Sequence, residues 1–107
     1  MDIEHFQLPV WILADKGGRE MMNERDGKRF VPVCDDATAA AVFLEQNKWL
    51  AGTVAAKPVS SLAHLLRVLI GSRDSGCKFL GRVAPSGSMK LLPIEAAIDA
   101  VQGSKSN

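Results

Sequence analysis

The chain has 107 residues, the usual size of one domain, and its 47% hydrophobic and 23% charged residues are typical of a globular protein. Its formal net charge of +1 gives no electrostatic case for a nucleic-acid partner. Its apolar runs are far shorter than the roughly 20 residues of a membrane span. The acidic start Met1–Glu4 argues against a secretory signal, and two cysteines without a pairing pattern argue against a disulfide framework. We therefore expect a small soluble protein of the cytoplasm, with no membrane partner.

The first third of the sequence predicts two antiparallel strands. Residues 9–14 form an apolar run without strict alternation, which is typical of a strand covered on both faces. A charged stretch follows and contains Asp26-Gly27, a dipeptide typical of hairpin turns, so a second strand is expected over residues 29–34. Because Pro32 cannot donate a ladder hydrogen bond, this second strand should lie at a sheet edge or turn its bond-free side outward.

The rest of the sequence predicts three helices and further strands. Asp36 is a suitable cap for a helix over 37–47, and a short strand is expected around 53–56. A helix over 60–70 is capped by Ser60-Ser61 and has a leucine-rich stripe, and Gly71 is well placed to end it. Two strands, 78–83 and 89–92, flank a turn at 84–88. A last helix over 93–102 starts at Pro93 and is stopped by Gly103.

These elements predict an α+β fold with the order β-β-α-(β)-α-β-β-α. A mixed, mostly antiparallel sheet should pack against about three helices in a single domain, residues 1–103, with 104–107 as a mobile polar tail. The side chains expected in the core belong to the apolar stripes of the helices: Phe43, Leu62, Leu65, Leu66, Leu69, Ile98 and Val101.

The cysteines and histidines do not form a metal motif. Structural zinc sites use closely spaced pairs of ligands, whereas Cys34 and Cys77 lie far apart in the sequence, as do His5 and His64. We expect no metal, no cofactor and no disulfide.

A catalytic interpretation is the alternative to a purely structural role for these residues. A thiol at a helix start, such as Cys34, can have a lowered pKa, but Asp35 and Asp36 beside it oppose the thiolate. We expect no catalytic residue and no enzymatic activity. The alternative is a small enzyme that uses Cys34, His64 and Asp15.

Charge is distributed unevenly along the chain. Residues 1–36 contain eight acids and five bases, a net −3, whereas residues 67–90 contain five bases and one acid, a net +4. If these bases share a face, they form a candidate binding region for an acidic partner. The five bases are Arg67, Arg73, Lys78, Arg82 and Lys90.

Part of the sequence resembles a known bacterial family. The strand at 10–15, the turn at Asp26-Gly27, the strand end Phe30-Val-Pro-Val-Cys-Asp35 and the Ala-rich helix at 37–46 are similar to the amino-terminal domain of SseB-like proteins. The resemblance is in residues mainly over 30–44 and otherwise in the order of elements. Cys34 stands where the family more often has Phe. The resemblance implies an α/β domain of a bacterial protein, without an established activity and without catalytic residues to transfer.

The function that we expect is therefore non-catalytic. The protein should act as a protein-binding or regulatory module of the bacterial cytoplasm, through an exposed edge strand at 30–34 or through the basic region at 67–90. The partner would be a protein, and an acidic one fits the basic region. An immunity-like protein that binds one dedicated effector is a further alternative.

Overall fold

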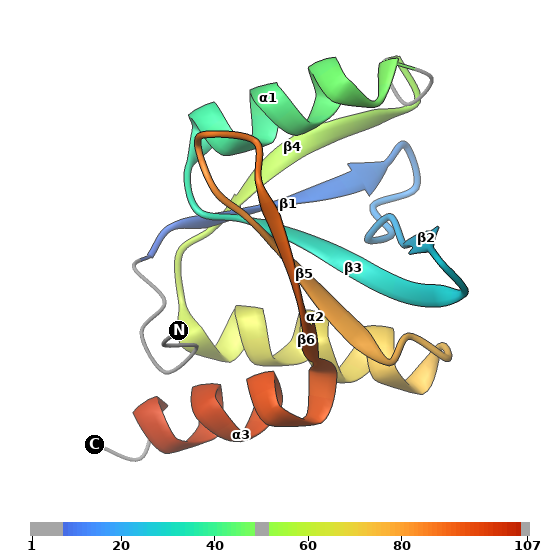
Figure 1. Ribbon diagram of the computed structural model, residues 1–107. Coiled ribbons are helices and arrows are strands. Elements are labelled where there is room, and N and C mark those ends of the chain that lie inside the picture. The colour runs from blue at the N-terminus through green and yellow to red at the C-terminus, as the bar shows by residue number, and fades with distance from the viewer. Residues whose placement is uncertain (1–7, 49–51, 106–107) are drawn as a thin grey trace.

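The computed structural model describes residues 8–48 and 52–105, which form three layers (Figure 1). One helix covers one face of a central sheet, and two helices cover the other face. Along the chain the elements are β1 (Val10–Asp15), β2 (Asn23–Arg25), β3 (Lys28–Cys34), α1 (Ala37–Gln46), β4 (Val54–Val59), α2 (Leu62–Asp74), β5 (Phe79–Val83), β6 (Met89–Pro93) and α3 (Ile94–Lys105).

The sheet is mixed and has six strands within the described residues. The strand order is β4-β1-β3-β5-β6, and β2 pairs with β3 beside β1. Of the described strands, only β3 and β5 run parallel, while every other neighbouring pair is antiparallel. The predicted α+β class, with a mostly antiparallel sheet and three helices, is therefore confirmed.

The Asp26-Gly27 dipeptide makes the turn that its chemistry predicts. Both residues have positive φ angles, 54° and 77°, as a type I′ hairpin turn requires, and Arg25 pairs with Lys28 across it. The strand before this turn is the short β2, which interrupts the charged stretch between β1 and β3.

The prediction that the strand over 29–34 lies at an edge is wrong, because β3 is in the interior of the sheet, between β1 and β5. The register of β1 against β3 stops at Ile12–Val33, one residue before Pro32. The carbonyl of Leu13 instead accepts a hydrogen bond of 2.7 Å from the N–H of Met21. Pro32 lies where the neighbour of β3 changes from β1 to β2, so its missing N–H is accommodated inside the sheet.

The helix starts follow the predicted caps. The Oδ1 atom of Asp36 accepts from the N–H of Ala39 at 2.8 Å, and the Oγ atom of Ser61 accepts from the N–H of His64 at 3.1 Å. These side chains satisfy backbone donors that have no partner in the first turn of a helix.

The predicted helix ends at Gly71 and Gly103 are wrong. Helix α2 continues through Gly71 to Asp74, because its buried stripe extends from Leu69 to Ser72, and the left-handed position after it is taken by Gly76 with a φ of 100°. Helix α3 continues through Gly103 to Lys105, so part of the segment expected to be a tail is helical; residues 106–107 lie outside the described residues.

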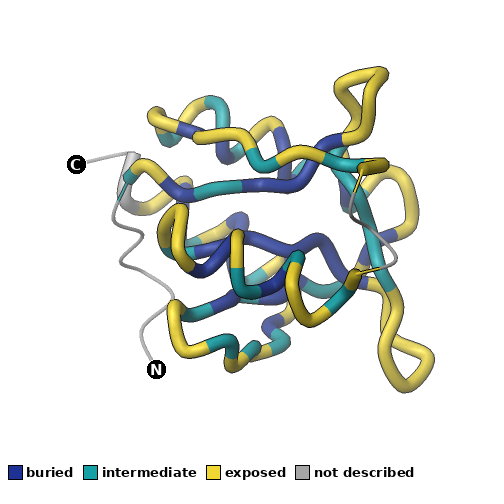
Figure 2. Tube along the Cα trace, turned by 90° about the horizontal axis from the view of Figure 1, so that it is seen from above, coloured by how far each residue is buried: buried dark blue, intermediate teal, exposed yellow. Residues whose placement is uncertain are grey.

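Two buried clusters lie on opposite faces of the sheet. Figure 2 shows that the buried stretches of the chain lie toward the middle of the molecule, whereas the outer turns are exposed. Under α1 the cluster is Leu13, Phe30, Cys34, Ala39, Ala40, Phe43 and Val83. On the other face, the strands and the α2–α3 pair bury Val10, Ile12, Val31, Val33, Val59, Leu65, Val68, Leu69, Cys77, Leu80, Leu92, Ile94, Ala97, Ile98 and Val101. The expected burial of five helix side chains is confirmed, whereas Leu62 and Leu66 are half-buried at the margin of the larger cluster.

Two glycine substitutions test where α2 ends. Gly71→Ala should raise the free energy of unfolding by about 0.5–1 kcal/mol, since Gly71 is helical and a Cβ there meets open space. Gly76→Ala should lower it by about 1 kcal/mol or more, because its φ of 100° is strained for alanine. Urea unfolding measures both. If Gly71→Ala instead lowers the free energy of unfolding and Gly76→Ala raises it, the helix ends at Gly71.

A second pair of substitutions tests which leucines of α2 form the core. Leu65 is completely buried, so Leu65→Ala should cost about 2–5 kcal/mol through lost burial and a cavity. Leu66→Ala should cost less than this range, because the half-buried side chain leaves a site open to water. Equal losses in denaturant unfolding would contradict the assigned face of the helix.

Candidate functional site

The five predicted bases do not form a single patch. Arg73 and Lys78 line the same shallow pocket near the turn between α2 and β5. Arg82 and Lys90 are register neighbours on β5 and β6, about four strand residues, or roughly 13 Å, from Lys78. Arg67 is an exposed residue of α2 that does not line this pocket. The basic region is therefore separated by the fold into distinct places.

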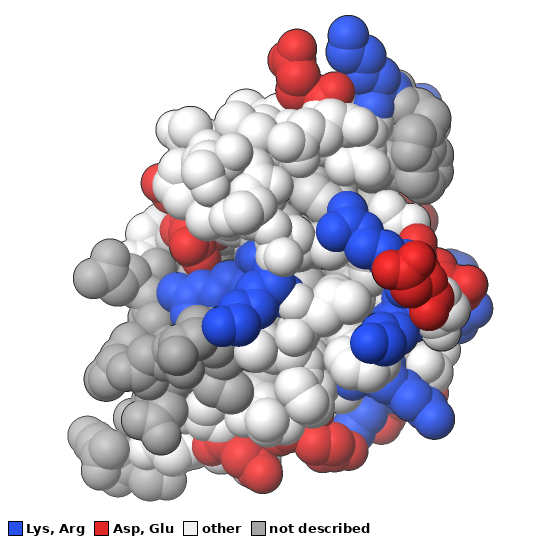
Figure 3. Space-filling view, in the orientation of Figure 1, with Lys and Arg blue, Asp and Glu red and all other residues white. Residues whose placement is uncertain are grey.

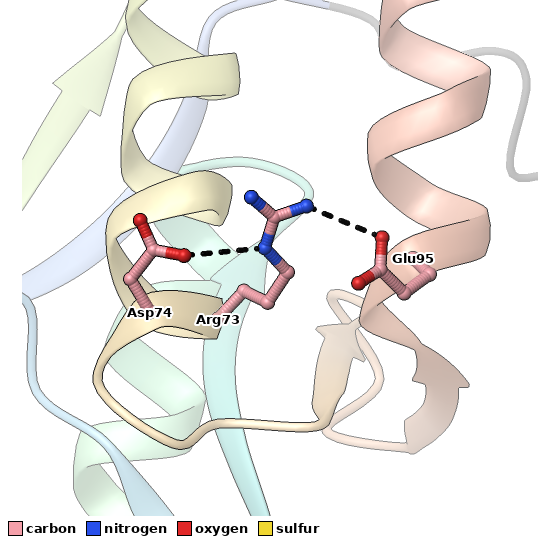
Figure 4. A network of polar contacts seen from close by, with 3 residues as sticks. All are labelled: Arg73, Asp74 and Glu95. Carbon is pink, nitrogen blue, oxygen red and sulfur yellow. Dashed lines mark hydrogen bonds and ion pairs between the residues drawn. The ribbon is translucent and has the colours of Figure 1, made fainter.

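Arg73 already has two acidic partners in the structure (Figure 4). Its guanidinium lies between Asp74 of the same helix and Glu95 of α3, each at 3.3 Å. The hydrogen bond to Asp74, with a smaller contribution from Glu95, raises the pKa of Arg73 above its ordinary value. Because these carboxylates accompany the arginine, Arg73 adds little net positive charge to the pocket of about 410 Å³ that it lines with Glu95.

Arg82 has a structural ion pair. Its Nε atom lies 2.8 Å from Oδ1 of Asp35, and both side chains are partly shielded from water. The N–H of Asp35 also donates to the carbonyl of Val83 at 2.9 Å. These contacts join β5 to the junction between β3 and α1. With Asp36 as the helix cap, both adjacent carboxylates have structural roles.

Two lysines, one just before β5 and one on β6, have no ion pair among the described residues. Lys78 and Lys90 are exposed, and no ion pair to either is found within the described part of the chain. Half-buried apolar side chains, Phe79, Met89 and Leu91, lie on the α1 face of the same two strands, whereas Lys90, between Met89 and Leu91 in the sequence, alternates to the opposite face. We call this region the β6 surface and define it as Lys28, Lys78, Phe79, Met89, Lys90 and Leu91.

The packing around Gly81 shapes the apolar part of the β6 surface. A Cβ atom on Gly81 would lie 2.6 Å from a ring carbon of Phe30 and 2.8 Å from the sulfur of Met89. The missing side chain therefore lets the Phe30 ring and the Met89 side chain lie over the backbone of β5. Phe79 pairs with Pro93 at the other end of this strand, where the Nζ atom of Lys28 lies 5.6 Å from the centre of its ring.

Lys28 is the basic residue of this surface that sequence reasoning missed. It belongs to the acidic first third of the chain, so counting charge along the sequence placed it away from the basic region. The parallel pairing of β3 with β5 brings the start of β3 beside Phe79, as the Phe30–Phe79 register shows. A hairpin turn at Asp26-Gly27 predicts that Lys28 begins a strand, but it does not predict the neighbouring strand.

The alternative catalytic residues are not brought together. Cys34 lies in the cluster under α1, whereas His64 is on α2, which covers the other face of the sheet. Asp15 is at the far end of β1, and its Oδ1 atom accepts from the N–H groups of Gly17 and Arg19 at 2.8 and 3.0 Å. Each of the three is thus held in a separate environment.

The two thiols are buried on opposite faces of the sheet, Cys34 with the α1 cluster and Cys77 with the α2–α3 cluster. Burial, followed by the charges of Asp35 and Asp36, raises the pKa of Cys34 to about 12. Burial also raises the pKa of Cys77. Within the described residues, no group of three or more potential His, Cys, Asp or Glu ligands comes together.

A second shallow pocket, of about 310 Å³, lies where β1 and β4 meet and is lined by Asp15, Lys16, Thr53 and Lys57 among others. The Asp15 carboxylate there already accepts the backbone hydrogen bonds of the turn that follows β1.

No helix in the described ranges is long and apolar enough to span a bilayer.

No protein-family model matches the sequence, and a search of curated proteins finds no relative. The resemblance to the SseB-like amino-terminal domain therefore stays a prediction.

The environment of Cys34 predicts that its thiol is alkylated very slowly in the native protein. With a pKa of about 12, roughly one Cys34 thiol in 10⁴ is ionised at pH 8, and only the thiolate is alkylated rapidly. In a Cys77→Ala variant, iodoacetamide should modify Cys34 of the native protein at least about a hundredfold more slowly than in urea. Mass spectrometry of quenched samples measures both rates. Equal rates would show that Cys34 is accessible and reactive.

Proposed function

We propose that this protein is a non-catalytic binding module that recognises an acidic protein through the β6 surface. The observation that carries the proposal is the combination of exposed lysines and half-buried apolar side chains on one edge of the sheet. Apolar contact supplies burial in such a surface, while lysines at its rim favour negatively charged partners.

The charges that remain for a partner are those without a structural role. Arg73 and Arg82 are engaged with carboxylates of the same chain, whereas Lys78 and Lys90 are exposed. In Figure 3, basic side chains lie across the middle of the face that shows β5 and β6 in Figure 1, beside a wide uncharged area. An acidic partner would be attracted over about 8 Å at physiological salt.

This proposal replaces one of the two surfaces expected from the sequence. The strand over 30–34 is interior, so its edge is not available to a partner. The dispersed positions of Cys34, His64 and Asp15 favour binding over the alternative of catalysis. A bacterial, cytoplasmic setting and an immunity-like role with one dedicated effector are compatible with the same surface.

The test is charge reversal at the exposed lysines. Lys78→Glu/Lys90→Glu should abolish retention of an acidic partner in a pull-down from lysate of the source cells. The wild-type protein should retain the partner at low salt and lose part of it at moderate salt. Arg73 and Arg82 are unsuitable positions, because a glutamate at either would face Glu95 or Asp35.

The matched control is Lys57→Glu/Arg67→Glu, which alters net charge equally at two exposed positions outside the β6 surface. It should retain the partner as the wild type does. Thermal melting of each variant checks that the fold is unchanged. A partner retained equally by both double variants would remove the β6 surface from consideration.

A further inference from the structure

We propose that the partner binds as an extended strand that adds to the free edge of β6, with side chains that alternate between apolar and acidic. This inference rests on the proposed function and specifies the conformation and the chemistry of the segment that is bound. Strand addition is a general mode of peptide recognition, in which backbone hydrogen bonds give affinity and alternate side chains give specificity.

The backbone of β6 has one side available for pairing. In the described sheet β6 is the last strand and pairs only with β5. The N–H of Ala84 donates to the carbonyl of Ser88 at 2.9 Å, so the residues of this hairpin pair are hydrogen-bonded to each other. Antiparallel ladders alternate, so the backbone groups of Lys90 and Leu92 point toward β5. Those of Met89 and Leu91 point to the open edge.

On one face of the sheet, the covering helix α1 does not extend over β6. Helix α1 packs chiefly on β1, β4, β3 and β5, whereas β6 packs on β5 and, through its other face, on α3. The side chains of Met89 and Leu91 join the margin of the α1-side cluster and are only half-buried. A strand beside β6 would extend this apolar layer without displacing a helix.

Side chains alternate along β6 in a way that specifies the partner. Met89 and Leu91 lie on the α1 face, and Lys90 between them lies on the opposite face. Alternate residues of an added strand would therefore meet Met89 and Leu91 on one face and Lys90 on the other. Apolar residues suit the first set, and a carboxylate suits the second.

Charge distinguishes this occupant from a second copy of the same chain. Both outer strands have an exposed lysine, Lys57 on β4 and Lys90 on β6, and neither strand contains an acidic residue. Pairing of two copies through these edges would provide no carboxylate for either lysine. The edge of β4 also has Pro58 within the strand, and two of its six residues are alanines with small side chains. The occupant that fits β6 is an acidic segment of a different protein.

The test uses a short synthetic peptide in which valine and glutamate alternate. Titrated into the full chain, the peptide should shift the NMR signals of the backbone amides of Met89 and Leu91 and leave those of Val54 and Ala56 on β4 unchanged. Methylating the peptide backbone nitrogens on the side that would face β6 should weaken binding by about tenfold or more, since those donors are lost.

Two further comparisons separate the parts of the inference. A peptide of the same composition, with its valines and glutamates in two blocks, should bind about tenfold more weakly than the alternating one. Lys90→Glu should weaken binding of the alternating peptide, while Lys57→Glu, its counterpart on the other edge, should not.

Each unfavourable result overturns a definite statement. Equal binding of the methylated peptide, shifts outside β6, or no binding at all would exclude strand addition of this segment. If Lys90→Glu does not weaken binding of the alternating peptide, a partner strand with acidic residues opposite Lys90 is excluded. If strand addition fails while Lys78→Glu/Lys90→Glu still abolishes capture of the cellular partner, the proposed function remains and only the mode of binding is wrong.

Discussion

The parallel pairing of β3 with β5 is the interaction on which the rest of the fold depends. In the described order β4-β1-β3-β5-β6, β3 pairs antiparallel with β1 of the β4–β1 pair and parallel with β5 of the β5–β6 pair, so it joins the two pairs. Parallel neighbours require a long connection, and here it passes through α1 on one face, β4 at the far edge and α2 on the other face. The pairing brings Phe30 over Gly81 on one side, while Val31 and Leu80 join the cluster on the other. One register therefore fixes both halves of the core.

The unequal cover of the two faces determines where a partner can act. Helices α2 and α3 bury one face of the sheet from β4 to β6, whereas α1 alone covers the other face. On that second face, half-buried apolar side chains remain at the margin of the α1 cluster. The Arg82–Asp35 ion pair and the hydrogen bond from Asp35 to Val83 join β5 to the start of α1. These two contacts hold β5 against the start of α1. Strand β6 lies on the other side of β5 and forms the edge of the described sheet. Binding by strand addition would use an edge that is already ordered by its pairing with β5, which lowers the ordering cost on the side of this protein.

The basic side chains of residues 67–90 have two different roles, which counting charge along the sequence does not distinguish. Of the five bases in residues 67–90, Arg73 and Arg82 hold carboxylates of the same protein. Lys78 and Lys90 extend into solvent, and Lys28 joins them from a segment that is acidic overall. Since a guanidinium can hold carboxylates with more than one N–H donor, arginines suit internal ion pairs. The flexible lysines remain for electrostatic attraction of a partner.

Local chemistry alone determined much of this protein. Asp36 and Ser61 as caps, Asp26-Gly27 as a hairpin turn, and the leucine stripe of α2 all follow from hydrogen-bonding groups, glycine conformation and periodicity within a few residues. The tertiary structure decided what depends on distant neighbours. Pro32 lies in an interior strand because β1 and β2 share one side of β3, and α2 passes Gly71 because its buried stripe continues. The β6 surface likewise exists only because parallel pairing places Lys28 beside Phe79, residues that the sequence separates by about half its length.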